Sequence, residues 1–135
     1  MPITHKKYLV SYIYIMVTTT KKKEDNNLTA TLKYALVSDK KMALMAQMVK
    51  GKKVEDALVL LQVLPKKAAK FLYKVIKSAY ANATTNATYD AKKLYVHKIE
   101  VGRGPKIQRV RFVSRSRISH YVKYRAFVKV FLHVK

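Results

Sequence analysis

Apolar and polar residues alternate in three stretches of the chain, and this period of two predicts β-strands. The first stretch runs from Leu28 to Leu36, where threonines and a lysine separate the first apolar residues. The second covers Leu94–Val101, and the third has an apolar residue at every second position from Val122 to Val134. We expect a half-buried strand in each stretch, and the last strand is expected to be continuous.

Between the first two strands, apolar residues recur at intervals of three and four, which is the period of an amphipathic helix. This spacing predicts three helices, at about Asp39–Lys50, Glu55–Val63 and Lys66–Asn82. Ser38 can cap the start of the first helix with its hydroxyl, and Gly51 can end that helix in a left-handed conformation.

The polar residues 84–93 are expected to form a loop, and the residues after the second strand predict a long β-hairpin. Glycines and a proline in 102–105 indicate a turn or bulge, and alternation resumes over Lys106–Ser114. Ser114–Arg117 suits a turn back into the last strand. A strand over Lys106–Ser114 would be roughly 30 Å long, so we expect the hairpin to project and to be held by an external partner.

These elements together predict an α+β fold with one domain. Three helices would pack on a short antiparallel sheet, with the long β-hairpin projecting from it. A chain of 135 residues, half of them apolar, can bury one modest core. We place the domain at 28–135, with its extended hairpin at about 106–129, and a separate N-terminal extension at 1–27.

The N-terminal extension contains an apolar run at Tyr8–Val17 that superficially resembles a signal peptide. However, the run contains Ser11 and three tyrosines, and threonines and lysines follow it without a small-residue cleavage site. It is also shorter than the roughly 20 apolar residues that span a bilayer. We expect a β-strand or a surface-hugging extension here, rather than a targeting or membrane segment.

Charge is the strongest signal in the composition, because 29 lysines and arginines stand against 7 acidic residues, a net charge of +22. Such an excess implies a polyanionic partner, either nucleic acid or an acidic membrane surface. All six arginines lie between Arg103 and Arg125, and no acidic residue follows Glu100. Since the arginine fork matches phosphate geometry and stacks on bases, this segment is the best candidate for close RNA contact.

We expect two sets of basic residues to bind RNA, mainly through phosphates that fix position without reading sequence. The first set, on the hairpin and its base, comprises Arg103, Lys106, Arg109, Arg111, Arg115, Arg117, Lys123 and Arg125. The second, near helix ends, comprises Lys40, Lys41, Lys50, Lys52, Lys53, Lys66 and Lys67. Tyr121 and Tyr124 either stack on bases or pack across the hairpin. Lysines along the third helix, including Lys70 and Lys74, either bind an anion or form a solvated face.

No residue pattern indicates catalysis, so we expect no enzyme, no catalytic residue, no metal site and no cofactor. The chain has no cysteine, and its four histidines lack metal-ligand spacing. Residues 102–104 are too short for a phosphate-cradling loop. The acids Asp39, Glu55 and Asp56 are better explained as helix-capping and dipole partners than as catalysts.

Five segments are informative by their order and spacing. They are Ser38–Lys53 (SDKKMALMAQMVKGKK), Val54–Leu58, Pro65–Ala69, Lys77–Ala83 and the Gly104-Pro105 pair ahead of the basic arm. Together they resemble universal large-subunit ribosomal protein twenty-two. The similarity covers about 100 residues, from about Leu28 to the end. The chain departs from the family where a tip glycine is usual, since Ser114–Arg117 has none, and at Arg125–Phe127, where Thr-Ser-His is usual.

The resemblance implies a small body on the outer surface of the large ribosomal subunit, in a bacterial cytoplasm or an organelle. It implies large-subunit rRNA, neighbouring ribosomal proteins and the nascent polypeptide as partners, with no membrane. The hairpin would reach inward and line the peptide exit tunnel. Its tip would be Arg111, Phe112, Val113, Ser114, Arg115, Ser116, Arg117 and Ile118.

Two other functions remain open from the residues alone. The first is a membrane-surface protein that uses Tyr8–Val17 as an interfacial anchor, which vesicle flotation would detect. The second is a free regulatory RNA-binding protein, which would not sediment with large particles.

Overall fold

The computed structural model describes residues 28–86 and 89–135, so the expected N-terminal strand or extension over 1–27 lies outside the described residues. The strands are β1 (Thr29–Ala35), β2 (Leu94–Arg103), β3 (Ile107–Val113), β4 (Arg117–Lys123) and β5 (Ala126–Val134). The helices are α2 (Asp39–Val49), α3 (Val54–Val63) and α4 (Lys67–Ala81), and short helical turns cover Asn82–Asn86 and Ala91–Lys93.

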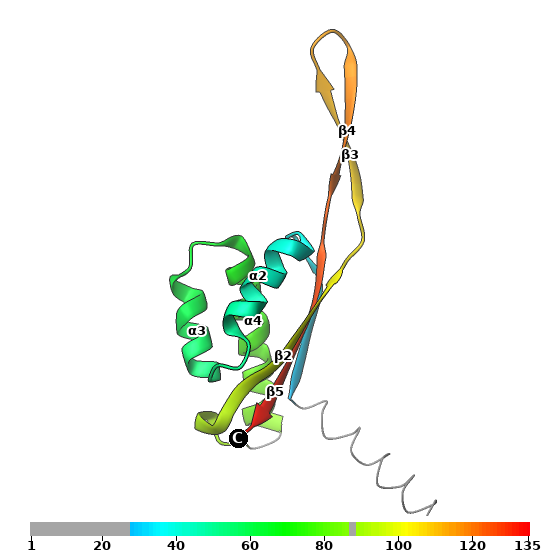
Figure 1. Cartoon of the computed structure of the whole chain (residues 1–135). Coiled ribbons are helices and arrows are strands. Elements are labelled where there is room, and N and C mark those ends of the chain that lie inside the picture. Colours follow the sequence, from blue (N-terminus) through cyan, green and yellow to red (C-terminus); the bar gives the residue numbers. More distant parts are fainter. Residues whose placement is uncertain (1–27, 87–88) are drawn as a thin grey trace, which may run out of the picture.

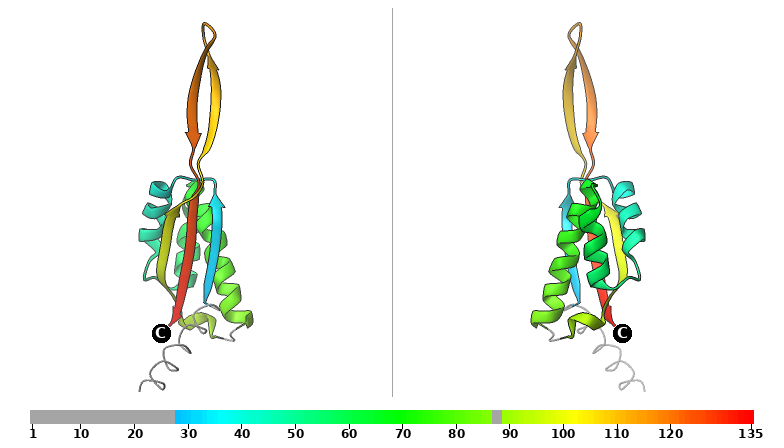
Figure 2. Two further views of the ribbon diagram at one scale, coloured as in Figure 1. Left: turned by 90° about the vertical axis from the view of Figure 1, so that its right-hand side faces the viewer. Right: turned by 90° about the vertical axis from the view of Figure 1, so that its left-hand side faces the viewer.

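Helices α2, α3 and α4 pack on one face of a three-stranded antiparallel sheet with strand order β1-β5-β2 (Figure 1). Strands β3 and β4 form a second, two-stranded sheet that projects away from this body, as the turned views also show (Figure 2). The expected α+β fold, with three helices on a short antiparallel sheet and a projecting hairpin, is therefore confirmed.

The core lies between the sheet and the helices, and the alternation of β5 aims one row of its side chains into it. Ala126, Val128, Val130 and Leu132 are buried, and the residues between them are only partly buried. The helices supply the other half of the core with the large, fully buried side chains Met42, Leu61, Leu72 and Ile76. These side chains give the body an apolar core of its own, which the described residues bury without a partner.

Strand β1 departs from the predicted alternation at its end. A β-bulge between Leu32 and Ala35 adds one residue relative to β5 and moves the following side chains to the other face. Ala35 is therefore buried, whereas Tyr34 is 56% exposed and Leu36 is exposed. The alternation over Leu28–Leu36 predicts that Tyr34 and Leu36 face the core with the other apolar residues, and this prediction was wrong. The bulge arises from the pairing of β1 with β5, which the sequence of β1 alone does not reveal.

The last predicted strand is two strands, because the chain bends between Lys123 and Ala126. At this bend the Gly104 N–H donates to the carbonyl oxygen of Arg125, at 2.8 Å. A Cβ on Gly104 would lie 3.0 Å from that oxygen, so the close approach favours glycine. Apolar residues continue the alternation beyond the bend, but they stay exposed because the body ends there.

Of the two predicted caps of α2, the structure confirms the C-terminal one at Gly51 but not the N-terminal hydrogen bond of Ser38. Gly51 has φ +79° and follows α2 as predicted, and its N–H donates to the Val96 carbonyl of β2 at 2.8 Å. Ser38 occupies the predicted N-cap position, but its hydroxyl donates to Asp39 Oδ1 rather than accepting a backbone N–H. The expected loop at 84–93 is also partly helical, since a turn continues α4 to Asn86.

Candidate nucleic-acid interface

The β3–β4 hairpin, hereafter the ribbon (residues 107–123), carries most of the expected RNA-binding arginines. Its strands pair in register from Ile107 opposite Lys123 to Val113 opposite Arg117. Seven residues per strand give a ribbon about 23 Å long. Every residue of the ribbon except Ile107 is exposed, and no other described element packs against it (Figure 2). The ribbon therefore presents both faces for binding.

The two faces of the ribbon differ in chemistry, because directly opposed residues share a face. One face carries Arg109 opposite Tyr121, Arg111 opposite Ser119, and Arg117 and Lys123 near its ends. We call this the cationic face. The other, the apolar face, carries Gln108, Val110, Phe112, Ile118, His120 and Val122. The basic residues expected to bind RNA are therefore concentrated on one face of the ribbon.

The tip of the ribbon is the turn Ser114–Ser116, close to the predicted position. Arg115 and Ser116 have φ values of 59° and 56°, in the left-handed region that glycine usually occupies. A residue with a side chain is less stable there by on the order of 1 kcal/mol. Arg115 is exposed in this turn, so positive charge is present at the tip.

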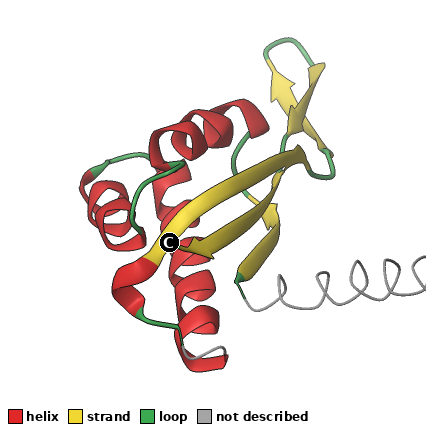
Figure 3. Cartoon of the chain, turned by 60° about the horizontal axis from the view of Figure 1, so that its bottom comes forward, coloured by secondary structure: helices red, strands yellow, loops and turns green. Residues whose placement is uncertain are grey.

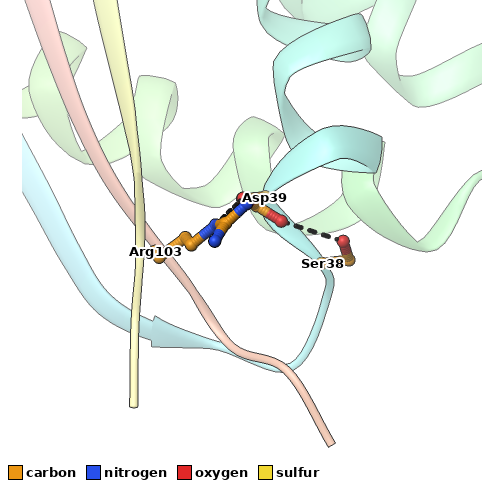
Figure 4. A network of polar contacts seen from close by, with 3 residues as sticks. All are labelled: Ser38, Asp39 and Arg103. Carbon is orange, nitrogen blue, oxygen red and sulfur yellow. Dashed lines mark hydrogen bonds and ion pairs between the residues drawn. The ribbon is translucent and has the colours of Figure 1, made fainter. Parts of the chain in front are cut away.

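At the base of the ribbon, Arg103 at the end of β2 contacts Asp39 at the start of α2 (Figure 4). The Nε–H donates to Asp39 Oδ2 at 2.9 Å, and the Ser38 hydroxyl donates to Oδ1 at 3.1 Å. The Arg103 hydrogen bond lowers the pKa of Asp39, and Asp39 raises the pKa of Arg103. Arg103 keeps 69% of its side chain exposed, so it can still reach a phosphate.

Three other predicted residues lie where the ribbon joins the body. The Lys106 ammonium lies 5.9 Å from the centre of the Tyr124 ring. Arg125 is half-buried at the bend, and its buried Nε has no hydrogen-bond partner among the described residues. Arg125 is therefore less accessible to a partner than the exposed arginines of the ribbon.

The structure divides the helix-end lysines into two groups. Lys41, Lys66 and Lys67 line one groove with Lys123 and Tyr124 from the ribbon base. This groove has a volume of about 760 Å³ and an apolar floor of Leu36, Val37, Leu44, Met45, Pro65 and Ala68. Lys40 is in the first turn of α2 and is not among the residues that line the groove. Lys50, Lys52 and Lys53 lie at the other end of α2, about 16 Å away along the helix.

Most of these cations lack an acidic partner. Within the described residues, ion pairs join Lys93 to Asp90, Lys98 to Glu100 and Arg103 to Asp39. The four ribbon arginines and the lysines of the groove and of α4 form no ion pair in that part of the chain. Their charges are available to a polyanion, which would also relieve their mutual repulsion.

Other kinds of site have no support in the described ranges 28–86 and 89–135. No group of three or more histidine, cysteine or acidic side chains is placed to hold a metal ion there. Likewise, none of the helices described has the length and apolar character needed to cross a membrane.

Comparison with known proteins gives one consistent result. The family model for ribosomal protein L22p/L17e matches residues 30–133. The large ribosomal subunit protein uL22 of Caldicellulosiruptor saccharolyticus is 38% identical over 99 residues, which cover 68% of this chain and 81% of the relative. The protein of the same name from Syntrophobacter fumaroxidans is 37% identical over 106 residues, which cover 78% of this chain and 96% of the relative.

The match over residues 30–133 covers all but the outermost residues of the sheet, together with the helices and the ribbon. Neither the relatives nor the described residues support the membrane-surface or free-regulator alternatives. The expected location in the large ribosomal subunit is confirmed, as is a structural rather than an enzymatic role. This chain belongs to the ribosomal protein L22p/L17e family and is a structural constituent of the large ribosomal subunit.

Proposed function

We propose that the chain binds large-subunit rRNA through the cationic face of the ribbon and the helix-end lysines, with the ribbon lying along the nascent-peptide exit tunnel. Its partners would be the rRNA, neighbouring ribosomal proteins and the passing polypeptide.

The observation that carries this proposal is the two-faced, uncovered ribbon. Arg109, Arg111 and Arg117 extend from one face without acidic partners in the described residues. Phosphate groups match the planar arginine fork and release counterions when they bind it. A two-stranded ribbon with no cover is marginally stable in water, so such a contact would also give it a fixed shape.

The apolar face supports the tunnel assignment. Phe112 is 77% exposed, and Val110 and Ile118 are exposed beside it. These side chains cannot bind phosphate, and exposed apolar patches commonly mark interaction sites. With rRNA on the cationic face, the apolar face is left for a partner that presents peptide rather than phosphate. A polypeptide moving through the tunnel is such a partner.

RNA binding is tested by measuring the affinity of the purified chain for large-subunit rRNA fragments at increasing salt. With about six to ten phosphates engaged, the affinity should fall by roughly 10³ to 10⁵ between low and physiological salt. The double change Arg109→Gln and Arg111→Gln should make the slope of log affinity against log salt shallower by about 2.

The matched control is Lys92→Gln with Lys93→Gln, which removes the same charge next to β2, away from the ribbon. This control should leave the slope almost unchanged. Equal effects of both pairs would mean that binding is diffuse charge attraction, and the ribbon would lose its assigned role.

The tunnel assignment needs a separate experiment on intact ribosomes. A stalled nascent chain with a photoreactive residue at successive positions should crosslink to the ribbon peptide that contains Phe112 and Ile118. Crosslinks to other tunnel components but to no ribbon residue at any position would rule out the tunnel assignment.

A further inference from the structure

The face of the three-stranded sheet opposite the helices is not covered by any described element. In the left panel of Figure 2 the strands β1, β5 and β2 lie in front and the helices lie behind them. Figure 3 shows from another direction that α2, α3 and α4 all lie on one side of the sheet. We call this second face the open face. Of the basic residues predicted from the sequence to bind RNA, Lys53 borders it, because Lys53 forms a β-bridge with Tyr95 at the edge of β2.

The strand register shows which side chains share the open face. Tyr95 pairs with His133, Lys98 and Thr29 flank Phe131, Glu100 and Thr31 flank Lys129, and Gly102 pairs with Phe127. A β-bulge between Val96 and Lys98 adds His97 to this surface, where its ring meets that of His133. Aromatic rings and lysines therefore interleave on an antiparallel sheet.

The rings form a connected cluster that borders a pocket. The centre of the His133 ring lies 5.2 Å from that of His97 and 5.8 Å from that of Tyr95. His97, Phe131, His133 and Tyr89 line a pocket of about 560 Å³, which is within the usual size range of small-ligand sites. His133 Nδ1 is buried here without a hydrogen-bond partner among the described residues. A buried polar atom of this kind is stabilised by a partner that supplies a hydrogen bond.

The charges of the open face favour an anionic partner. The Lys129 ammonium lies 4.8 Å from the centre of the Phe131 ring, and the Lys135 ammonium lies 5.7 Å from that of Tyr95. Glu100 is the only acid among the paired residues of this face. It accepts a 2.7 Å hydrogen bond from Lys98, and this hydrogen bond lowers the pKa of Glu100. A polyanion would draw the ammonium groups from the rings to its phosphates. The ring faces would then be free for flat groups of the same ligand.

We propose that the open face binds unpaired nucleotides of RNA, with one nucleobase in the pocket between His97, Phe131 and His133. Single-stranded RNA is recognised by stacking of its bases on exposed aromatic rings, with basic groups on its backbone. The phosphates of the bound segment contact Lys129 and Lys135, and His133 Nδ1 hydrogen-bonds to an edge of the base. This inference rests on the proposed function, because it adds a stacking surface to a protein that binds rRNA.

Photocrosslinking separates this surface from the ribbon. The full chain is mixed with single-stranded oligonucleotides that contain 4-thiouridine, at a salt concentration that weakens phosphate contacts more than stacking. Mass spectrometry then locates the adducts. We expect adducts on peptides that contain His97, Phe131 or His133, in addition to adducts on the ribbon.

The change Phe131→Leu keeps an apolar side chain but removes the ring. It should lower the affinity for the oligonucleotide by about tenfold at that salt, since the stacking contact of one base is lost. Phe71→Leu is the matched control, because Phe71 is a half-buried phenylalanine on α4, on the helical side of the sheet. This control should bind like the unchanged chain, and thermal unfolding checks that both variants fold.

Three results would contradict the proposal in distinguishable ways. Adducts on the ribbon alone, with normal binding by Phe131→Leu, would leave RNA binding intact and remove the stacking surface. No adducts anywhere would overturn the proposed function as well. Crosslinks in intact ribosomes from the open face to a neighbouring protein, with none to rRNA, would show that this face is a protein contact.

Discussion

Strands β4 and β5 follow one another in the chain and share an alternating pattern, yet their surroundings are opposite. In β5 every second side chain is buried against the helices, whereas every residue of β4 is exposed. Each fully buried valine or leucine of β5 adds about 1.5 to 3 kcal/mol to the stability of the folded body. No side chain of β4 is buried in this way within the described residues. The difference shows that alternation indicates a strand without indicating what will cover it.

The body therefore carries the stability of the chain, and the ribbon takes its stability from a partner. This difference in stability can be tested by measurements that report on the body and on the ribbon separately.

The largest difference is expected in amide hydrogen exchange of the free chain. Amides of β5 such as Val130 should open with a free energy close to that of global unfolding, about 5 to 15 kcal/mol. Amides of the ribbon such as Val110 should open with a free energy close to zero, because few contacts hold the ribbon. Adding an rRNA fragment should protect the ribbon selectively. Strong protection of the ribbon without RNA would contradict the division.

The next largest effect is expected from truncating one large side chain in each region. Leu72 is fully buried, so Leu72→Ala should lower the free energy of unfolding by about 2 to 5 kcal/mol. Phe112 lies on the ribbon with 77% of its surface exposed, so Phe112→Ala should change it by less than about 0.5 kcal/mol. Urea denaturation measures both values. A substantial loss for Phe112→Ala would mean that the ribbon packs on the body in solution.

The smallest effect concerns the contact that joins the two regions. Arg103 holds the pKa of Asp39 below its ordinary value of 3.8, so the contact stabilises the folded state above that pH. The stabilisation should disappear as the pH falls through the lowered pKa of the folded state. It should be small, because exposed ion pairs are screened by water.

The change Asp39→Asn should remove this pH dependence, as measured by the difference in unfolding free energy from the unchanged chain between pH 2 and pH 6. The control Asp56→Asn changes an exposed acid of α3 that forms no ion pair among the described residues. If both changes had the same pH profile, the contact with Arg103 would not be responsible.

The helices and strands of the body could be predicted because their burial is one-sided and periodic. Residues such as Met42, Leu72 and Val130 lie where the spacing places them. The bulge that exposes Tyr34 could not be predicted in this way, because it depends on the register with β5. The bend before Ala126 was also missed, since the apolar pattern continues through a point where the cover ends.

The residues of the candidate site could be predicted in part, but the contacts between them could not. Clustered arginines identified the ribbon, whose use in binding remains a proposal. The contact between Arg103 and Asp39 joins residues 64 positions apart, and no local pattern reveals it. The two faces of the ribbon follow from the pairing of its strands, which the turn at Ser114–Ser116 sets. His97 and His133 were missed at the level of the sequence because they lack metal-ligand spacing. The available signal was the alternation of aromatic and basic residues over Phe127, Lys129, Phe131, His133 and Lys135.

The two-faced ribbon limits how its length can change during evolution. Deleting a single residue from β3 would turn every later side chain of that strand to the opposite face, placing arginine among apolar neighbours. Removing two residues from each strand would shorten the ribbon and keep the faces intact. Homologues with longer or shorter ribbons should therefore differ by even numbers of residues in each strand.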